Sequence, residues 1–151
     1  MTKKKPAASR VEDDPVLTLT EAKKWVSARR VTEIECVVPD QAGVARGKIM
    51  PASKFFSDPS MGLPSSIFVQ TISGEYPDED EDFSYDPSDG DVELHPDYST
   101  LCLVPWAQDP TAQVIHDAFY RDGRPVEIAP RQVLKRVLEL YEKKGWRPVV
   151  A

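Results

Sequence analysis

The chain has only two cysteines and two histidines among its 151 residues, which limits the metal and redox chemistry open to it. The spacings of Cys36, Cys102, His95 and His116 match no zinc-binding signature. Both cysteines lie in strand-like runs of aliphatic residues. We therefore expect two buried, reduced thiols, as is usual for a cytoplasmic protein, with a disulfide between neighbouring strands as the less favoured alternative.

Long apolar runs are also missing from the sequence. No segment approaches the roughly 18 apolar residues of a membrane-spanning helix, so we predict no membrane partner. Residues 1–16 carry lysines with no apolar stretch behind them, which excludes a secretory signal. This segment is predicted to be a disordered N-terminal arm.

Basic residues are absent from one segment, 75–91, although it holds nine acidic residues. The net charge of −6 is therefore concentrated there, and the rest of the chain is slightly basic. The segment disfavours nucleic acid as a partner and leaves open a cationic one, namely a metal, a polyamine or a basic face of another subunit. Its prolines and its small apolar content favour a solvated, exposed loop.

Catalytic signatures are lacking as well. The sequence has no nucleophile–base arrangement, no phosphate-binding glycine loop and no cluster of metal-ligating carboxylates on rigid strands. We therefore predict no catalytic residue, no metal site and no bound cofactor within these 151 residues.

What is present is a β-hairpin, over residues 32–51. Ile34, Cys36 and Val38 fall on one side of the first strand, opposite Glu33 and Glu35. A turn with proline at one end and glycine at the other leads to a second strand, 44–50. Such a hairpin buries one face only, so the rest of the chain must cover it. Its basic side chains, Arg46 and Lys48, are expected to pair with the acidic segment or with the glutamates across the hairpin.

Helices are predicted on both sides of this hairpin. Thr18 and Glu21 have the spacing of a capping box, which begins a helix that ends near Arg29. Pro130 begins the most strongly periodic helix, which ends before Gly145. The other expected elements are a helical turn at 52–56, an extended segment at 65–73, an irregular stretch at 91–97, and strands at 99–105, 112–119 and 146–150.

This order of elements predicts an α+β fold, a β-grasp-like mixed sheet with a crossing helix, over residues 17–145. Residues 146–151 are apolar and strand-like. They fit either an edge strand of the same sheet or the start of a catalytic domain that is absent, and we predict the second.

Five short motifs, in this order, resemble the N-terminal domain of the glutamine synthetase family, particularly its γ-glutamylpolyamine synthetase branch. They are Ala45-Arg46-Gly47-Lys48; Ser65-Ser66-Ile67; Asp91 to Asp97 as D-x-x-L-x-P-D; Val104-Pro105-Trp106; and Gly123-Arg124-Pro125 before Pro130-Arg131.

The resemblance implies an ATP-dependent ligase that joins the γ-carboxylate of glutamate to ammonia or a larger amine. Family members use ATP with magnesium or manganese, and their catalytic domain holds these ligands. The N-terminal domain would then pack against the catalytic domains of its own and a neighbouring subunit in a homo-oligomeric ring. These 151 residues alone are expected to be inactive.

The resemblance also implies an amine entrance at Leu63, Ser66 and Asp91. The family's ammonium-binding aspartate aligns with Leu63, and a leucine cannot hold an ammonium ion, so a larger amine is expected. Without the resemblance, we would predict that Asp91 caps a turn and that Ser66 lies in a solvated loop.

Two other functions remain open at this stage. A free-standing ubiquitin-like module would use the hairpin face and the acidic segment to hold a protein partner, without catalysis. A small cation-binding protein would need ordered carboxylates in the acidic segment, and the prolines there argue against them.

Overall fold

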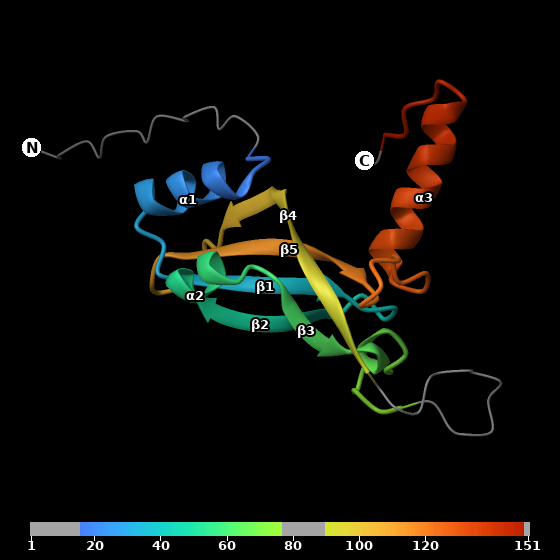
Figure 1. Cartoon of the computed structure of the whole chain (residues 1–151), viewed down its shortest axis with the longest axis horizontal. Coiled ribbons are helices and arrows are strands. Elements are labelled where there is room, and N and C mark those ends of the chain that lie inside the picture. Colours follow the sequence, from blue (N-terminus) through green and yellow to red (C-terminus); the bar gives the residue numbers. More distant parts are fainter. Residues whose placement is uncertain (1–15, 77–89, 150–151) are drawn as a thin grey trace, which may run out of the picture.

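The computed structural model describes residues 16–76 and 90–149 of the chain (Figure 1). The predicted N-terminal arm and most of the acidic segment lie outside these ranges. The helices are α1 (Leu19–Ala28), α2 (Ala52–Ser57), the 3-10 helix η1 (Ser65–Phe68) and α3 (Pro130–Lys143). The strands are β1 (Glu33–Pro39), β2 (Ala45–Pro51), β3 (Met61–Pro64), β4 (Asp91–Leu103) and β5 (Thr111–Phe119).

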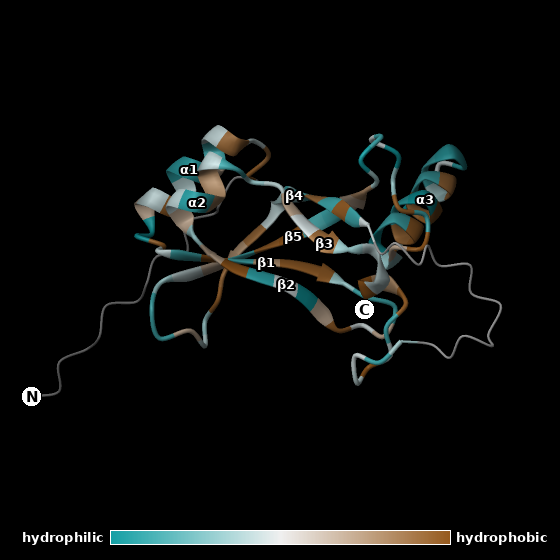
Figure 2. Cartoon of the chain, turned by 60° about the horizontal axis from the view of Figure 1, so that its bottom comes forward, coloured by the Kyte–Doolittle hydropathy of each residue, from teal (hydrophilic) through white to brown (hydrophobic). Residues whose placement is uncertain are grey.

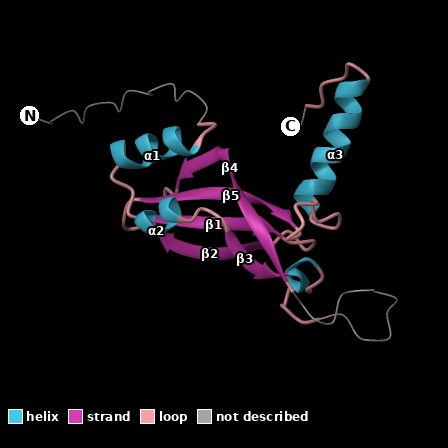
Figure 3. Cartoon of the chain, viewed as in Figure 1, coloured by secondary structure: helices cyan, strands magenta, loops and turns pink. Residues whose placement is uncertain are grey.

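These strands form one mixed sheet in the order β2-β1-β5-β4-β3 (Figure 3). Strands β1 and β5 pair in parallel at its centre, and the other neighbours pair antiparallel. A mixed sheet with a few helices confirms the predicted α+β fold. The hairpin that the sequence places at 32–51 is β1 and β2, with Glu33 opposite Pro51 and Pro39 opposite Ala45.

The sheet curls until its two edge strands approach each other. Strands β2 and β3 are at opposite ends of the strand order, yet Lys48 Nζ on β2 donates a 2.8 Å hydrogen bond to the carbonyl oxygen of Gly62 on β3. Beside it, Arg46 Nη2 donates to the carbonyl oxygen of Thr71. Side chains therefore close the gap between the edge strands and give the sheet a nearly barrel-like shape.

The core lies on the concave side of the sheet and includes Val26 of α1 and Phe55 of α2. Hydrophobic stretches of β1 and β5 are brown in Figure 2. Alternate residues of each strand enter the core, as the period-two pattern requires. The helix α1 begins at the predicted capping box, in which Glu21 N donates to Thr18 Oγ1 and Thr18 N donates to Glu21 Oε2. The fully buried side chains of the core include Ile34, Cys36, Val38, Phe55, Phe68, Val92, Leu94 and Val114.

The structure corrects three predicted elements. Residues 65–68 form a 3-10 helix and not an extended segment. Residues 91–103 form one continuous strand, in which the register shifts between Asp97 and Cys102, so Pro96 does not break it. Residues 146–149 form no strand, because no described strand lies beside them.

Two predicted side-chain environments also need correction. Cys36 is buried, and burial raises the pKa of its thiol to about 12, but Cys102 is exposed; neither forms a disulfide. Of the two partners expected for Arg46, the glutamates across the hairpin do not bind it, and most of the acidic segment lies outside the described residues. Arg46 forms a 2.8 Å ion pair with Asp40, whose carboxylate is fully buried and also accepts from Val44 N. Among the described residues, no helix is both long and apolar enough to span a membrane.

His116 is a buried titratable group in the core. Its side chain on β5 is 0% exposed and lies edge-on to the ring of Phe55. Nδ1 lies 3.3 Å from the carbonyl oxygen of Val114, so the neutral ring donates from Nδ1, whereas Nε2 has no hydrogen-bond partner among the described residues. Burial lowers the pKa of His116 to about 4, although nearby backbone oxygens and Asp117 favour the charged form.

This lowered pKa predicts a loss of stability on acidification. The unfolded chain takes up a proton near pH 6.5 and the folded chain only near pH 4, so the neutral ring stabilises the fold fully above pH 6.5. Below it, the free energy of unfolding should fall by about 1.4 kcal/mol per pH unit, or about 2 kcal/mol between pH 7 and 5. Urea unfolding at both pH values measures this loss. His116→Leu should remove most of it and His95→Gln, at an exposed position, should not; an equal loss in the leucine variant would refute the assignment.

Candidate functional site

The residues that the sequence assigns to an amine entrance lie at one corner of the sheet, where β3 leads into η1 beside the start of β4. Pro64 is opposite Asp91 and Leu63 is opposite Val92 in the β3–β4 ladder. Ser65 N then donates to the carbonyl oxygen of Gly90, which holds η1 against the first residue of β4. The structure therefore brings Leu63, Ser66 and Asp91 together from segments 25 to 28 residues apart in the chain.

The three side chains offer different chemistry at this corner. The carboxylate of Asp91 is exposed and lies over Gly62, where an added Cβ would be only 3.0 Å from Asp91 Oδ2. Leu63 is half-buried and packs against the core. Ser66 is 1% exposed, and its hydroxyl lies 3.5 Å from that of Tyr76. An incoming ligand would thus meet a carboxylate and an apolar surface, whereas Ser66 is buried behind them.

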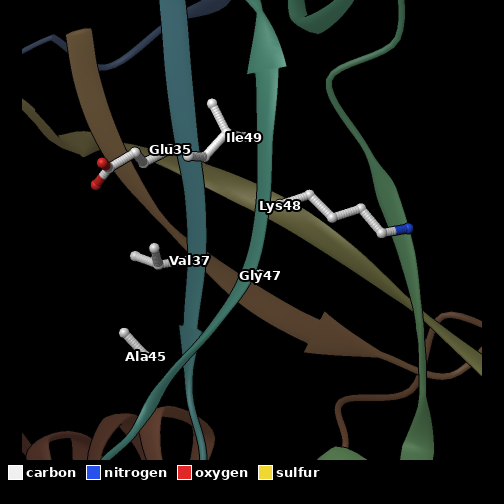
Figure 4. Close-up of a pocket in the computed structure, with 6 residues that line it drawn as sticks. All are labelled: Glu35, Val37, Ala45, Gly47, Lys48 and Ile49. Carbon is white, nitrogen blue, oxygen red and sulfur yellow. The ribbon is translucent and has the colours of Figure 1, made fainter.

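A shallow hollow lies on the convex face of the β1–β2 hairpin (Figure 4). Its volume is about 180 Å³, and Gly47 is one of the residues that line it. Val37 and Ala45 point to one side of the hairpin, whereas Lys48 points to the other, toward β3 (Figure 4). The ammonium group of Lys48 therefore donates its hydrogen bond to Gly62 and points away from this hollow.

A larger hollow, of about 460 Å³, lies where β4 and β5 meet the turn that follows β5. His95 Nε2 is 3.4 Å from Glu93 Oε2, and the His95 ring is edge-on to that of Phe119. Arg121 and Gly123 complete the lining. The sequence analysis did not find this hollow, because its residues are brought together only by the pairing of β4 with β5.

An ion cluster, which the sequence analysis also missed, joins α3 to the sheet. It consists of Asp97 on β4, Asp117 on β5, and Arg131 and Lys135 on α3. Arg131 binds both carboxylates, with Nε 2.8 Å from Asp117 Oδ1, and Lys135 binds Asp117 as well. Burial would raise the pKa of Asp97, but hydrogen bonds from Ser99 and the charges of Arg131 and Lys135 outweigh it and lower the pKa. The sequence held one signal of this cluster, namely Arg131 in the first turn of α3, where the helix dipole favours an acidic residue.

The described residues do not make a complete catalytic site. They include no group of three or more side chains that could hold a metal ion. The corner with Asp91 and Leu63 can attract a cation and contact an alkyl group, but nothing in it can activate a carboxylate. By its geometry, this corner can contribute to a binding site for a cation that carries an alkyl group.

The chain is similar to curated proteins of one family over most of its length. It is 28% identical to a glutamate–isopropylamine ligase of a Pseudomonas species over 85% of the chain, and 30% identical to a γ-glutamylethanolamide synthetase of Streptomyces coelicolor over 93%. It is 31% identical to a glutamine synthetase of Thermus thermophilus over 85%. These alignments cover 28–30% of the relatives, so the chain spans less than a third of their length.

Solved structures support the same fold. Two structures of GmaS, one in complex with ADP and one without ligand, superpose on 79–80% of the chain with TM-scores of 0.61 and 0.63 at 23% identity. No protein-family model matches the sequence. The ordered motifs, the mixed sheet and the alignments over 85–93% of the residues lead to one conclusion: the chain belongs to the glutamine synthetase family.

Proposed function

We propose that the chain is the N-terminal part of an ATP-dependent ligase that joins the γ-carboxylate of glutamate to an amine. The observation that carries this proposal is the alignment of 85–93% of the chain with a glutamate–isopropylamine ligase and a γ-glutamylethanolamide synthetase. Both relatives are named for amides of glutamate with amines larger than ammonia.

The residues at the β3–β4 corner support a preference for such amines. An alkylammonium ion has a charged end and an apolar body, and the exposed carboxylate of Asp91 and the half-buried Leu63 lie on adjacent strands. The carboxylate attracts the cation, and the leucine contacts its alkyl group. Ammonia has no alkyl group, so it gains nothing from Leu63.

The nucleotide and the metal belong, in this proposal, to the part of the ligase that this chain does not span. The described residues offer no set of metal ligands, and the sequence has no phosphate-binding glycine loop. ATP with magnesium or manganese would activate the glutamate carboxylate there. The chain's own role would be to border the active site of a neighbouring subunit with the corner that carries Leu63 and Asp91.

Leu63→Asp tests the assignment of the amine site. In the complete protein we expect the ratio of kcat/KM for isopropylamine to that for ammonia to fall about 10-fold or more, because the new carboxylate stabilises a small cation and repels an alkyl group. Glutamate-dependent ATP hydrolysis across ammonia, ethanolamine and isopropylamine measures the ratio.

A matched variant separates selectivity from folding. Leu63 packs against the core, so both Leu63→Asp and Leu63→Asn should lower the melting temperature, but only the aspartate variant should gain ammonia use. Unchanged amine selectivity in a folded Leu63→Asp protein would refute the placement of the amine beside β3.

A further inference from the structure

Two basic side chains of β2 reach across to the segment that forms the β3–β4 corner. Arg46 and Lys48 are two residues apart and so lie on the same face of the strand. Lys48 Nζ donates to the carbonyl oxygen of Gly62 at 2.8 Å, and Arg46 Nη2 donates to that of Thr71 at 3.2 Å. These two residues of β2, the cation clamp, therefore hold the segment between Gly62 and Thr71 at both of its ends.

A buried carboxylate fixes the arginine of the clamp. Asp40 is 1% exposed; its carboxylate binds Arg46 Nε at 2.8 Å and accepts a second bond, also of 2.8 Å, from Val44 N. The planar guanidinium has several donors and binds Asp40 and Thr71 at once. At the far end, Thr71 closes a turn, because its backbone N–H donates to the carbonyl oxygen of Glu75. The arginine therefore joins two parts of the chain that are each held by further hydrogen bonds.

The lysine of the clamp binds a residue that adjoins both Leu63 and Asp91. The oxygen that Lys48 binds belongs to the planar peptide that joins Gly62 to Leu63, so the bond sets the orientation of the leucine's backbone. A Cβ on Gly62 would be only 3.0 Å from Asp91 Oδ2, so the carboxylate lies close to the same residue. Since β3 ends the strand order, β4 is its one neighbour among the described strands, and Lys48 supplies a tie to the opposite edge strand.

We propose that the cation clamp positions residues 62–71 for binding of the amine, so that Arg46 and Lys48 are specificity-determining positioning residues of the ligase. This inference rests on the proposed function. Selection between ammonia and an alkylamine requires a fixed separation between Leu63 and the carboxylate of Asp91, and a displacement of about 1 Å can cost a site about 100-fold in rate. Supporting contacts that lock such groups in place are therefore part of a working site. The two cations act through the carbonyl oxygens that they bind and not by contact with the amine.

Steady-state kinetics of Lys48→Met in the complete protein tests the clamp. Methionine keeps an unbranched side chain but has no donor, so the KM for isopropylamine should rise about 5-fold, the equivalent of one hydrogen bond, whereas the KM values for glutamate and ATP should change less than about 2-fold. Lys48→Arg, which keeps a donor, should recover most of the affinity. Arg46→Lys should also raise the KM for isopropylamine, because an ammonium group lacks the planar fork of a guanidinium. Lys54→Met removes a cation whose side chain is 60% exposed, and this control should leave all three KM values unchanged.

Amide hydrogen exchange of the 151-residue chain supplies a readout that needs no turnover. In Lys48→Met the amides of residues 62–71 should exchange about 5-fold faster, and those of α1 should be unchanged. Unchanged exchange of residues 62–71 would overturn the proposal. So would an unaltered KM for isopropylamine, an equal rise in the KM values for glutamate and ATP, or the same effect in Lys54→Met. The unmodified complete protein separates the two hypotheses: no glutamate- and amine-dependent turnover refutes the ligase together with this role of the clamp, whereas turnover that Lys48→Met does not alter refutes the clamp only.

Discussion

Gly47→Ala should destabilise the chain by about 3 kcal/mol or more, because this position of the β1–β2 hairpin has no room for a methyl group. A Cβ on Gly47 would lie 1.8 Å from the carbonyl oxygen of Cys36 on the adjacent strand. That oxygen is backbone in the middle of the sheet, so it cannot move aside without disturbing the β1–β2 ladder. The φ of Gly47, +154°, is a second obstacle, since side chains rarely tolerate it.

Urea unfolding monitored by circular dichroism measures this loss. Gly43→Ala is the matched control, because Gly43 also has a positive φ, +78°, but nothing lies within 4 Å of its added Cβ. The control should lose only about 1–2 kcal/mol, the cost of a left-handed alanine. Equal losses at the two positions would show that contact with Cys36 does not constrain the hairpin.

Arg131→Leu should cost about 2–4 kcal/mol and release α3 from the sheet. The side chain is only 19% exposed and binds Asp97 and Asp117 at once, so its removal leaves two carboxylates close together with Lys135 as their remaining cation. Arg131→Lys should recover part of the loss, since an ammonium group cannot reproduce the two-sided geometry of a guanidinium. Chemical unfolding gives the free energies, and hydrogen exchange of α3 reports its release.

The control for this variant is a second arginine in an exposed ion pair. Arg124, with its side chain 66% exposed, binds Asp122 and Glu127 at the surface. Arg124→Leu should therefore change the free energy of unfolding by less than about 1 kcal/mol. If the two arginine variants lost the same amount, the ion cluster would not be what holds α3.

Local sequence signals were sufficient for several elements of the fold. The capping box at Thr18 and Glu21 and the alternation over 33–38 are confirmed as α1 and β1, since each depends on neighbouring residues alone. The strand β4 was not foreseen as continuous, because Pro96 resembles a strand break. Its pairing with β5, which the sequence does not display, carries the strand through a register shift.

The sequence could not predict which face of α3 packs against the sheet. Its periodicity predicted an amphipathic helix beginning at Pro130, and that helix is confirmed. Periodicity does not show which face of the helix meets the sheet. That depends on Asp97 and Asp117, which precede their partner Arg131 by 34 and 14 residues. For the same reason the hollow beside His95 was missed, whereas motifs of the family had grouped Leu63 with Asp91, which do lie on paired strands.

Glutamate-dependent ATP hydrolysis tests the central proposal most directly, namely that this family member serves a ligase whose chemistry is carried out by a larger portion of the protein. The measurement compares the complete protein with the 151-residue chain in the presence of ATP, magnesium and an amine. We expect phosphate release by the complete protein only when glutamate and an alkylamine are both present, with a γ-glutamyl amide as the product. Turnover by the 151-residue chain alone, or phosphate release by the complete protein that is independent of the amine, would contradict the account.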